Sequence, residues 1–201
     1  MKKIISVILV IATVAVLFAS CAVNKDKVIV SGNYTYVTLE DNTAKITKYN
    51  SSENLLTLEI PSSIDDMTVT VIGEDAFSGV QTIGAVTFPD TITLIEENAF
   101  KGSSITRAYM HRCSALTEIK PFAFSECSNL VQVTLPGSVE TIGERAFHYC
   151  AKLKVVNFNG DTANIDMFAF DASPEVKIYA KPEAKNVISF AETYGIELSV
   201  S

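Results

Sequence analysis

The sequence has few positive charges, and after its first residues it nowhere gathers them into a basic patch. It contains 16 Lys and Arg against 23 Asp and Glu in 201 residues, and loss of residues 1–20 would leave a net charge of −9. A surface of this sign repels phosphate groups. We therefore exclude nucleic acid as a partner, and we exclude binding of the folded chain to anionic lipid headgroups.

The sequence also lacks an apolar run long enough to span a membrane as a helix. The apolar run at residues 4–18 has 15 residues, whereas a spanning helix needs about 20. Lys2 and Lys3 precede this run, and the small residues Ala19 and Ser20 follow it. This arrangement is typical of a bacterial secretory signal peptide, which we assign to residues 1–20.

A third absence concerns catalysis. The sequence contains no serine elbow and no glycine loop that would cradle a phosphate. His148 directly follows a predicted core phenylalanine, and the acids fall in turns between buried positions, where solvation explains them. These acids are Glu96, Glu97, Glu118, Glu140 and Glu144. We predict that the protein is not an enzyme and carries no cofactor.

What the sequence does contain is a repeat. The motif Ile-x-x-x-Ala-Phe occurs five times at intervals of 23 or 24 residues, within the 20–29-residue range of one leucine-rich-repeat coil. We predict a β-rich leucine-rich-repeat solenoid, a curved right-handed array with one short parallel strand per coil. The repeated side chains should form one buried column. Its members are Ile72, Phe77, Ile95, Phe100, Ile119, Phe124, Ile142, Phe147, Ile165 and Phe170.

Each coil continues into a short segment with β-branched residues and alternating polarity, which predicts a strand. The clearest segments are residues 83–89, 130–136 and 153–158, and proline closes the first two because it cannot donate to a strand ladder. The third coil departs from the pattern, since it is one residue shorter before its strand and two residues longer after it, through residues 111–116. Such insertions map to loops that are often functional.

Both ends of a solenoid need a cap, and the sequence predicts two. Residues 34–39 and 44–49 alternate as a hairpin does, and a further strand follows at residues 56–61. At the other end, Pro182 should open a helix that Gly195 ends, followed by a strand at residues 196–200. One face of that helix carries Val187, Ala191 and Tyr194.

We therefore divide the chain into five parts: a signal peptide (1–20), a tether (21–30), a β cap (31–61), an array of about five coils (62–181) and a C-terminal cap (182–201).

The outward side of the predicted strands is the candidate binding surface. In the pattern Leu-x-x-Val-x-Leu, the second, third and fifth places point away from the core. Val131 and Val155 occupy two of these places, and the others form the candidate site: Thr106, Arg107, Tyr109, Gln132, Thr134, Lys154 and Asn157. An arginine, an aromatic ring and amides on a rigid sheet suit contact with a protein or glycan. Solvated strands without a partner would have the same composition.

Cysteine and histidine raise the question of a metal site. His111, Cys113, Cys127, His148 and Cys150 are residue types that bind zinc, but they lack paired ligand spacing, so we predict no metal. Cys127 and Cys150 each follow a motif phenylalanine by three residues and should occupy the same position in adjacent coils. Buried thiols are the simpler interpretation, and a disulfide is the alternative, although the strand spacing slightly exceeds the usual Cβ separation.

Two stretches resemble known families. Residues 142–153, Ile-Gly-Glu-Arg-Ala-Phe-His-Tyr-Cys-Ala-Lys-Leu, resemble the coil of BspA-like leucine-rich-repeat proteins, and the resemblance extends over about residues 55–181. Ser, Gly and Asp-Ala-Ser stretches replace the expected cysteine in the first, second and fifth coils. The resemblance implies an exported bacterial surface protein that acts in adhesion or recognition.

Residues 17–21, Leu-Phe-Ala-Ser-Cys, resemble a lipoprotein lipobox, although Phe18 stands where leucine is preferred. This resemblance implies cleavage before Cys21 and attachment of lipid to that residue. Cleavage after Ala22, which would give a secreted protein without Cys21, and an uncleaved anchor are the alternatives.

Together these observations predict a lipid-anchored surface module that binds an extracellular protein or glycan. The alternative is a structural envelope lipoprotein that associates with other surface proteins.

Overall fold

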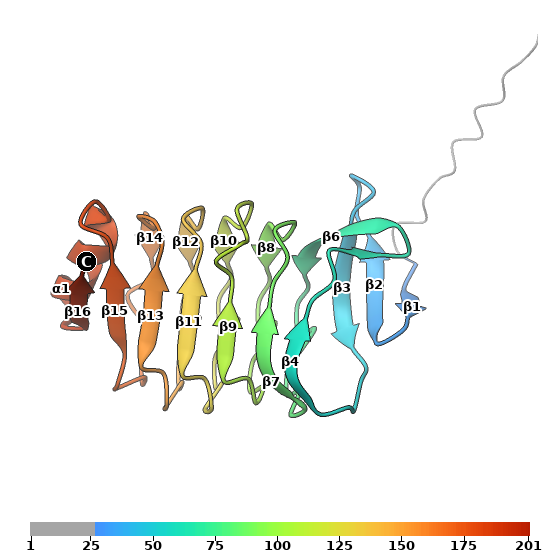
Figure 1. Ribbon diagram of the computed structural model, residues 1–201, viewed down its shortest axis with the longest axis horizontal. Coiled ribbons are helices and arrows are strands. Elements are labelled where there is room, and N and C mark those ends of the chain that lie inside the picture. The colour runs from blue at the N-terminus through green and yellow to red at the C-terminus, as the bar shows by residue number, and fades with distance from the viewer. Residues whose placement is uncertain (1–26) are drawn as a thin grey trace, which may run out of the picture.

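The computed structural model describes residues 27–201, so the signal peptide and Cys21 lie outside the described residues. Two sheets, one of nine strands and one of seven, face each other across a single elongated core. Figure 1 shows the coils stacked side by side along the long axis of the molecule. The predicted leucine-rich-repeat solenoid is confirmed.

The seven-stranded sheet holds the predicted strand of each coil and is parallel throughout. Its strands, in spatial order from the N-terminal end, are β4 (Leu55–Glu59), β7 (Ile83–Thr87), β9 (Arg107–Tyr109), β11 (Gln132–Leu135), β13 (Val155–Phe158), β15 (Lys177–Ala180) and β16 (Glu197–Val200).

The nine-stranded sheet combines the N-terminal cap with a second, shorter strand from each coil. The cap strands are β1 (Ile29–Ser31), β2 (Tyr34–Thr38) and β3 (Ala44–Tyr49), followed by β6 (Met67–Ile72), against which β5 (Ser63–Ile64) folds back. The short strands are β8 (Leu94–Ile95), β10 (Glu118–Ile119), β12 (Thr141–Ile142) and β14 (Asn164–Ile165). Each of these short strands ends at the isoleucine of the repeated motif. The sequence pattern did not predict these strands or their pairing.

The motif phenylalanines form a continuous stack of parallel rings through the core. Successive ring centroids from Phe77 to Phe170 lie 4.7, 5.1, 5.3 and 5.3 Å apart, with interplanar angles of at most 8°. Among the predicted core residues, only Ile165 is partly exposed. The stack is longer than predicted, because Tyr49 lies on Phe77 at 5.3 Å and Phe190 lies beside Phe170 at 6.2 Å.

Residues in left-handed backbone conformation lie on both sides of the column phenylalanine in four coils and on one side in the fifth. The residue two places before it has a φ of 53–57° in four coils, at Asp75, Asn98, Phe122 and Arg145. The residue two places after it has a φ of 54–67° in all five coils, at Gly79, Gly102, Glu126, Tyr149 and Ala172. These residues turn the chain on both sides of the ring, and glycine, which tolerates the conformation best, is used in only two coils.

The predicted hairpin caps the N-terminal end of the core. β2 and β3 pair antiparallel, and β1 adds a third strand through Ile29, inside the range assigned to the tether. The carboxylate of Asp65, in the turn between β5 and β6, accepts hydrogen bonds from the hydroxyls of Ser31 at 2.7 Å and Tyr36 at 3.0 Å. This contact ties the turn to the outermost strands.

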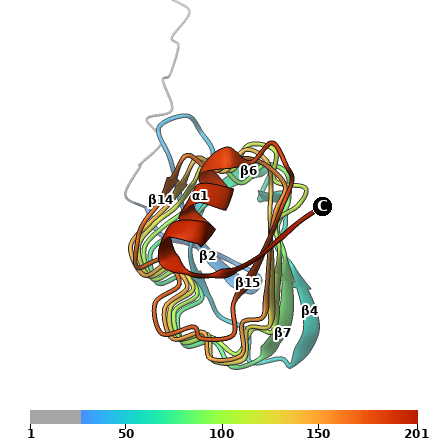
Figure 2. The ribbon, with the colours of Figure 1, turned by 90° about the vertical axis from the view of Figure 1, so that its left-hand side faces the viewer.

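Helix α1 (Lys185–Tyr194) closes the other end and lies across the last coil (Figure 2). Val187 and Ala191 face the core as predicted. The third predicted residue, Tyr194, is 47% exposed, and the buried position belongs to Phe190. Gly195 ends the helix with a φ of 67°. In residues 27–201, no helix is long and apolar enough to cross a membrane.

Candidate functional site

The outward side chains of the seven-stranded sheet lie in straight rows across the strands, and we call this surface the outer face. Strand register aligns the third place of each coil in one row: Thr57, Ala85, Arg107, Gln132, Val155, Lys177 and Glu197. The fifth places form a second row: Glu59, Thr87, Tyr109, Thr134, Asn157, Tyr179 and Ser199.

The structure brings all seven predicted site residues together on the outer face. Five of them lie in the two rows above. Thr106 and Lys154 lie in a third row, made by the second places, in which each backbone N–H donates to the carbonyl of the coil before it. Arg107 and Lys154 are exposed, and the other five side chains are half-buried. Their role in binding remains a prediction.

Hydrogen bonds and ion pairs divide the outer face into occupied and free groups. Lys154 Nζ lies 3.0 Å from Glu175 Oε2, and Lys177 Nζ lies 2.7 Å from Glu197 Oε1. Within residues 27–201, the guanidinium of Arg107 has no ion pair and no hydrogen bond. Arg107 is therefore the cation of this surface that is available to an incoming acceptor.

Sequence reasoning missed both ends of the outer face. Lys177 and Tyr179 extend the rows on β15, where the ammonium of Lys177 lies 5.5 Å from the ring centroid of Tyr179. Leu56 and Glu59 begin the rows on β4. A signal for β4 was present, because residues 55–60 follow the same pattern of three aliphatic residues as the later coils.

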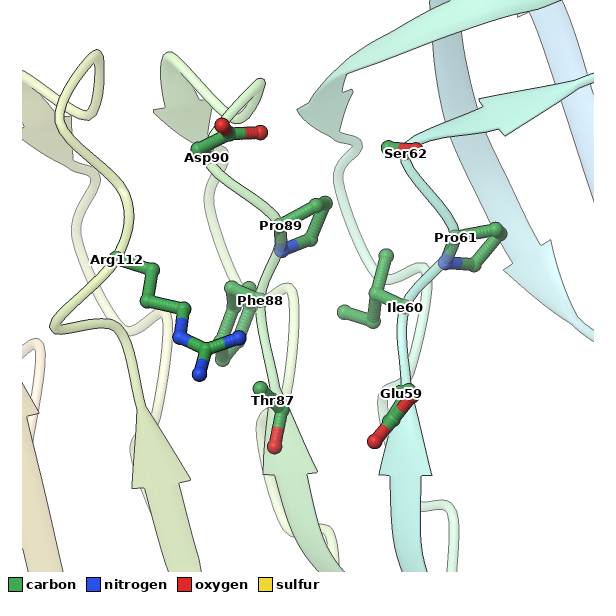
Figure 3. A pocket seen from close by; sticks show the side chains of 9 residues that line it. All are labelled: Glu59, Ile60, Pro61, Ser62, Thr87, Phe88, Pro89, Asp90 and Arg112. Carbon is green, nitrogen blue, oxygen red and sulfur yellow. The ribbon is translucent and has the colours of Figure 1, made fainter.

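The irregular third coil contributes to a groove beside the outer face. Its inserted loop is anchored by buried Cys113, whose thiol donates to the carbonyl of Pro89 at 3.2 Å. The next residue back, Arg112, is exposed and lines a groove of about 800 Å³ at the carboxyl ends of β4 and β7. Figure 3 shows Arg112 on one side of this groove and Glu59 on the other, with Asp90 above Pro89.

The three described cysteines are free, buried thiols, as the simpler interpretation predicted. Cys127 and Cys150 donate to the carbonyls of Phe100 and Phe124, each in the coil before, at 3.1 and 3.2 Å. Ser173 makes the same bond to Phe147 at 2.7 Å. Burial raises the pKa of Cys127 to about 11 and that of Cys113 to about 12, and it raises the pKa of Cys150 well above the usual range. These thiols hold coils together and are not nucleophiles at neutral pH.

The rings of the two histidines contact side chains other than the thiols. His148 Nε2 lies 3.5 Å from Asp171 Oδ2, and His111 lies edge-on to Tyr109 with ring centroids 6.4 Å apart. In the part of the chain that the structure describes, no three residues of the types His, Cys, Asp and Glu converge as a metal site requires.

The repeat itself matches a known family model. The BspA type leucine rich repeat region matches residues 49–177 in six copies. The chain belongs to the BspA-type leucine-rich-repeat family. This BspA-type chain thus has one copy more than the five motifs of its sequence, and the match begins at Tyr49, the residue that continues the aromatic stack.

Two solved structures show the same solenoid. The leucine rich repeat protein of T. pallidum is 26% identical, with a TM-score of 0.69 over 76% of this chain and 71% of that one. The pneumococcal vaccine antigen PcpA is 22% identical, with a TM-score of 0.55 over 78% of this chain and 43% of that one, and supports the fold alone. No curated protein sequence matches the chain. Leucine-rich-repeat solenoids of this family are generally non-enzymatic interaction scaffolds.

Proposed function

We propose that this protein is a non-enzymatic recognition module of the bacterial cell surface and that its outer face binds an extracellular protein or glycan. One observation carries the proposal. Among the described residues Arg107 has no partner; it lies in the third-place row, two residues before the half-buried Tyr109 of the fifth-place row, on a rigid parallel sheet. A half-buried aromatic ring on a rigid sheet loses little entropy on binding, and an arginine with unused donors can bind an incoming acceptor; both residue types are enriched among those that dominate interfaces.

The export signal and the lipobox-like residues support a lipid anchor on Cys21. An anchor there would place the N-terminal cap nearest the membrane, with the coils and the outer face beyond it. Growth of cells with a fatty-acid analogue tests this directly. We expect the wild-type chain to take up label and the Cys21→Ala variant to take up none, and label on the variant would exclude Cys21 as the acylated residue.

The binding proposal is tested with residues 22–201 on arrays of extracellular proteins and glycans. Captured ligands are then measured against a variant with alanine at Arg107, Tyr109, Gln132 and Lys154. We expect affinity to fall at least about tenfold, or about 1.4 kcal/mol, with an unchanged melting temperature. A matched control places alanine at Thr117, Glu140 and Asn164, which are exposed on the side of the other sheet.

Two results would contradict the proposal. Unchanged affinity of the outer-face variant would move the site elsewhere on the molecule. Co-purification with envelope proteins alone, without capture of any extracellular ligand, would instead support the alternative of a structural envelope lipoprotein.

A further inference from the structure

The two sheets of the solenoid have four edge strands, and three of them carry features that discourage pairing with another chain. β1 has three residues and β14 has two, which is too short to template a strand, and helix α1 packs beside β16. The fourth, β4, has five residues, contains no proline or lysine, and pairs only with β7 among the described strands. β4 is therefore the one long edge that this part of the chain leaves uncovered.

The hydrogen bonds of the later coils show which groups of β4 are unused. At the second place, Thr106 N donates to Gly84 O, Val131 N to Thr106 O and Lys154 N to Val131 O. Leu56 holds this place in the first coil of the sheet, where no earlier coil supplies a carbonyl. Its side chain is 93% exposed, the highest value for a large apolar residue in residues 27–201. An open backbone edge beside an exposed leucine is the arrangement that an added strand completes.

The part of the sequence that contains this edge is acidic. Residues 49–100, which contain β4 to β8, hold nine of the 23 Asp and Glu and none of the 16 Lys and Arg. Lys45 of β3 pairs with one of these acids, Glu96, at 3.2 Å. Glu53 and Glu59, just before β4 and at its last position, are exposed and have no ion pair among the described residues. The field near β4 is therefore negative and attracts a basic segment.

The groove described above begins where β4 ends and offers room for the flank of an added segment. Its walls come from Glu59 to Ser62, from Thr87 to Asp90 and from Arg112 (Figure 3). Glu59 and Asp90 can accept a hydrogen bond from a lysine or arginine. Arg112 has no partner among the described residues and can donate to a backbone carbonyl of the same segment.

From these observations we infer that the free edge of β4 is a second binding site, separate from the outer-face site, and that it takes an extended, basic segment of a partner protein by strand addition. The backbone of the segment pairs with Leu56, Thr57 and Glu59. An aliphatic side chain covers Leu56, and a basic one meets Glu59. A second copy of this chain is a poor occupant, because it would bring the same acidic segment to the edge.

The test uses a fluorescent ten-residue peptide of alternating lysine and valine, capped at both ends, with residues 22–201 of the protein. We expect saturable binding that weakens as salt rises. Thr57→Pro removes an edge N–H, and an edge strand tolerates proline, so this variant should weaken binding at least about tenfold. Thr57→Val keeps the N–H and should bind within about twofold of wild type. Circular dichroism and melting curves verify that both variants fold.

Two further comparisons separate strand addition from attraction by charge alone. Methylation of alternate peptide nitrogens should abolish binding, while Glu59→Gln should weaken it less than Thr57→Pro does. The variant with alanine at Arg107, Tyr109, Gln132 and Lys154 should bind the peptide with wild-type affinity. The proposal for the β4 edge and the proposal for the outer face can therefore be contradicted independently.

Several results would overturn the inference. The inference is wrong if the unmodified peptide does not bind, or if the methylated peptide binds as tightly as the unmodified one. It is also wrong if Thr57→Pro and Thr57→Val bind the peptide with equal affinity. The inference would also be wrong if light scattering showed a wild-type dimer that Thr57→Pro dissociates, because the occupant would then be a second copy.

Discussion

The side chain of Asp161 caps helix α1 from a loop 25 residues earlier in the chain, with Oδ1 2.7 Å from the backbone nitrogen of Asn186. The same oxygen also accepts a hydrogen bond from Val187 N at 3.2 Å. The helix has no cap of its own, because the residue at its N-cap position is Ala184. The C-terminal cap is therefore joined to the last coil by a charge-assisted contact at the positive end of the helix.

Removal of this contact should loosen the C-terminal cap. Asp161→Ala leaves two backbone N–H groups of the first helical turn without their acceptor, and we expect a loss of about 1–2 kcal/mol in the free energy of unfolding. Urea denaturation measures the change. Glu183→Ala, which removes an exposed acid next to the helix start, is the matched control and should have little effect. Equal losses in the two variants would show that charge near the helix matters and the specific bonds do not.

The ring stack should be sensitive to deletion at its centre. Phe124 is fully buried between Phe100 and Phe147, so Phe124→Ala should reduce the free energy of unfolding by about 3–5 kcal/mol. Phe168→Ala, at a residue 42% exposed and outside the stack, should cost far less. Thermal and chemical denaturation compare the two. A small loss at Phe124 would contradict the view that the stack holds the coils together.

Two residues in left-handed backbone conformation predict opposite effects of substitution on stability. Gly102 has a φ of 64° and open space around it, so Gly102→Ala should destabilise the protein by about 1 kcal/mol through backbone strain alone. Ala172 has a φ of 54° at the equivalent place, and Ala172→Gly should stabilise by about 0.5 kcal/mol once the greater freedom of the unfolded chain is subtracted. Melting temperatures should move in opposite directions, and a shift of the same sign in both would refute the argument.

The buried thiols predict a loss of stability in alkali. Their usual pKa is 9.0, and that of Cys127 is raised to about 11 in the fold by burial. Between these values the unfolded chain releases a proton that the folded chain keeps, so stability present below pH 9 falls as pH rises toward 11. The slope approaches about 1.4 kcal/mol per pH unit for each thiol. Urea titrations at pH 8, 9 and 10 measure it.

A variant isolates the thiol contribution from other alkaline effects. Cys127→Ser should remove part of the slope while it keeps a donor toward the carbonyl of Phe100, as Ser173 does toward Phe147. The wild-type thiols should also resist a thiol reagent at pH 8 until the protein unfolds. An unchanged slope in the serine variant, or rapid labelling of the folded protein, would contradict this account.

The sequence predicted most of the fold because the spacing of the repeated residues follows from how the coils pack. A phenylalanine at intervals of 23 or 24 residues can be buried only if the coils stack, and alternating residues can face outward only from a strand. The two-residue strands could not be predicted in the same way. Residues such as Glu118 and Ile119 are too few for a period to show, and they form a strand only because the neighbouring coils offer backbone partners.

The candidate site was predictable in position and less so in extent. The outward places of three coils followed from the strand pattern. The β4 strand fits this pattern but has no Ile-x-x-x-Ala-Phe motif before it, and the β15 strand departs from the pattern because Glu175 stands at its first, aliphatic place. The groove and its residue Arg112 depend on how an inserted loop folds back onto β7, which no local pattern encodes. Asp161 was missed for the same reason, because a capping residue 25 positions away leaves no spacing signal.

The uniform stacking of the coils has a consequence for how this chain can change in length. A typical coil contributes one phenylalanine ring, a left-handed residue on each side of that ring, and one strand to each sheet, and it touches chiefly its two neighbours. Loss or duplication of one whole coil between equivalent points would leave the two caps meeting surfaces of the same shape. The length of the solenoid can thus change in steps of one strand spacing, about 4.8 Å, while the structures of its two caps stay the same.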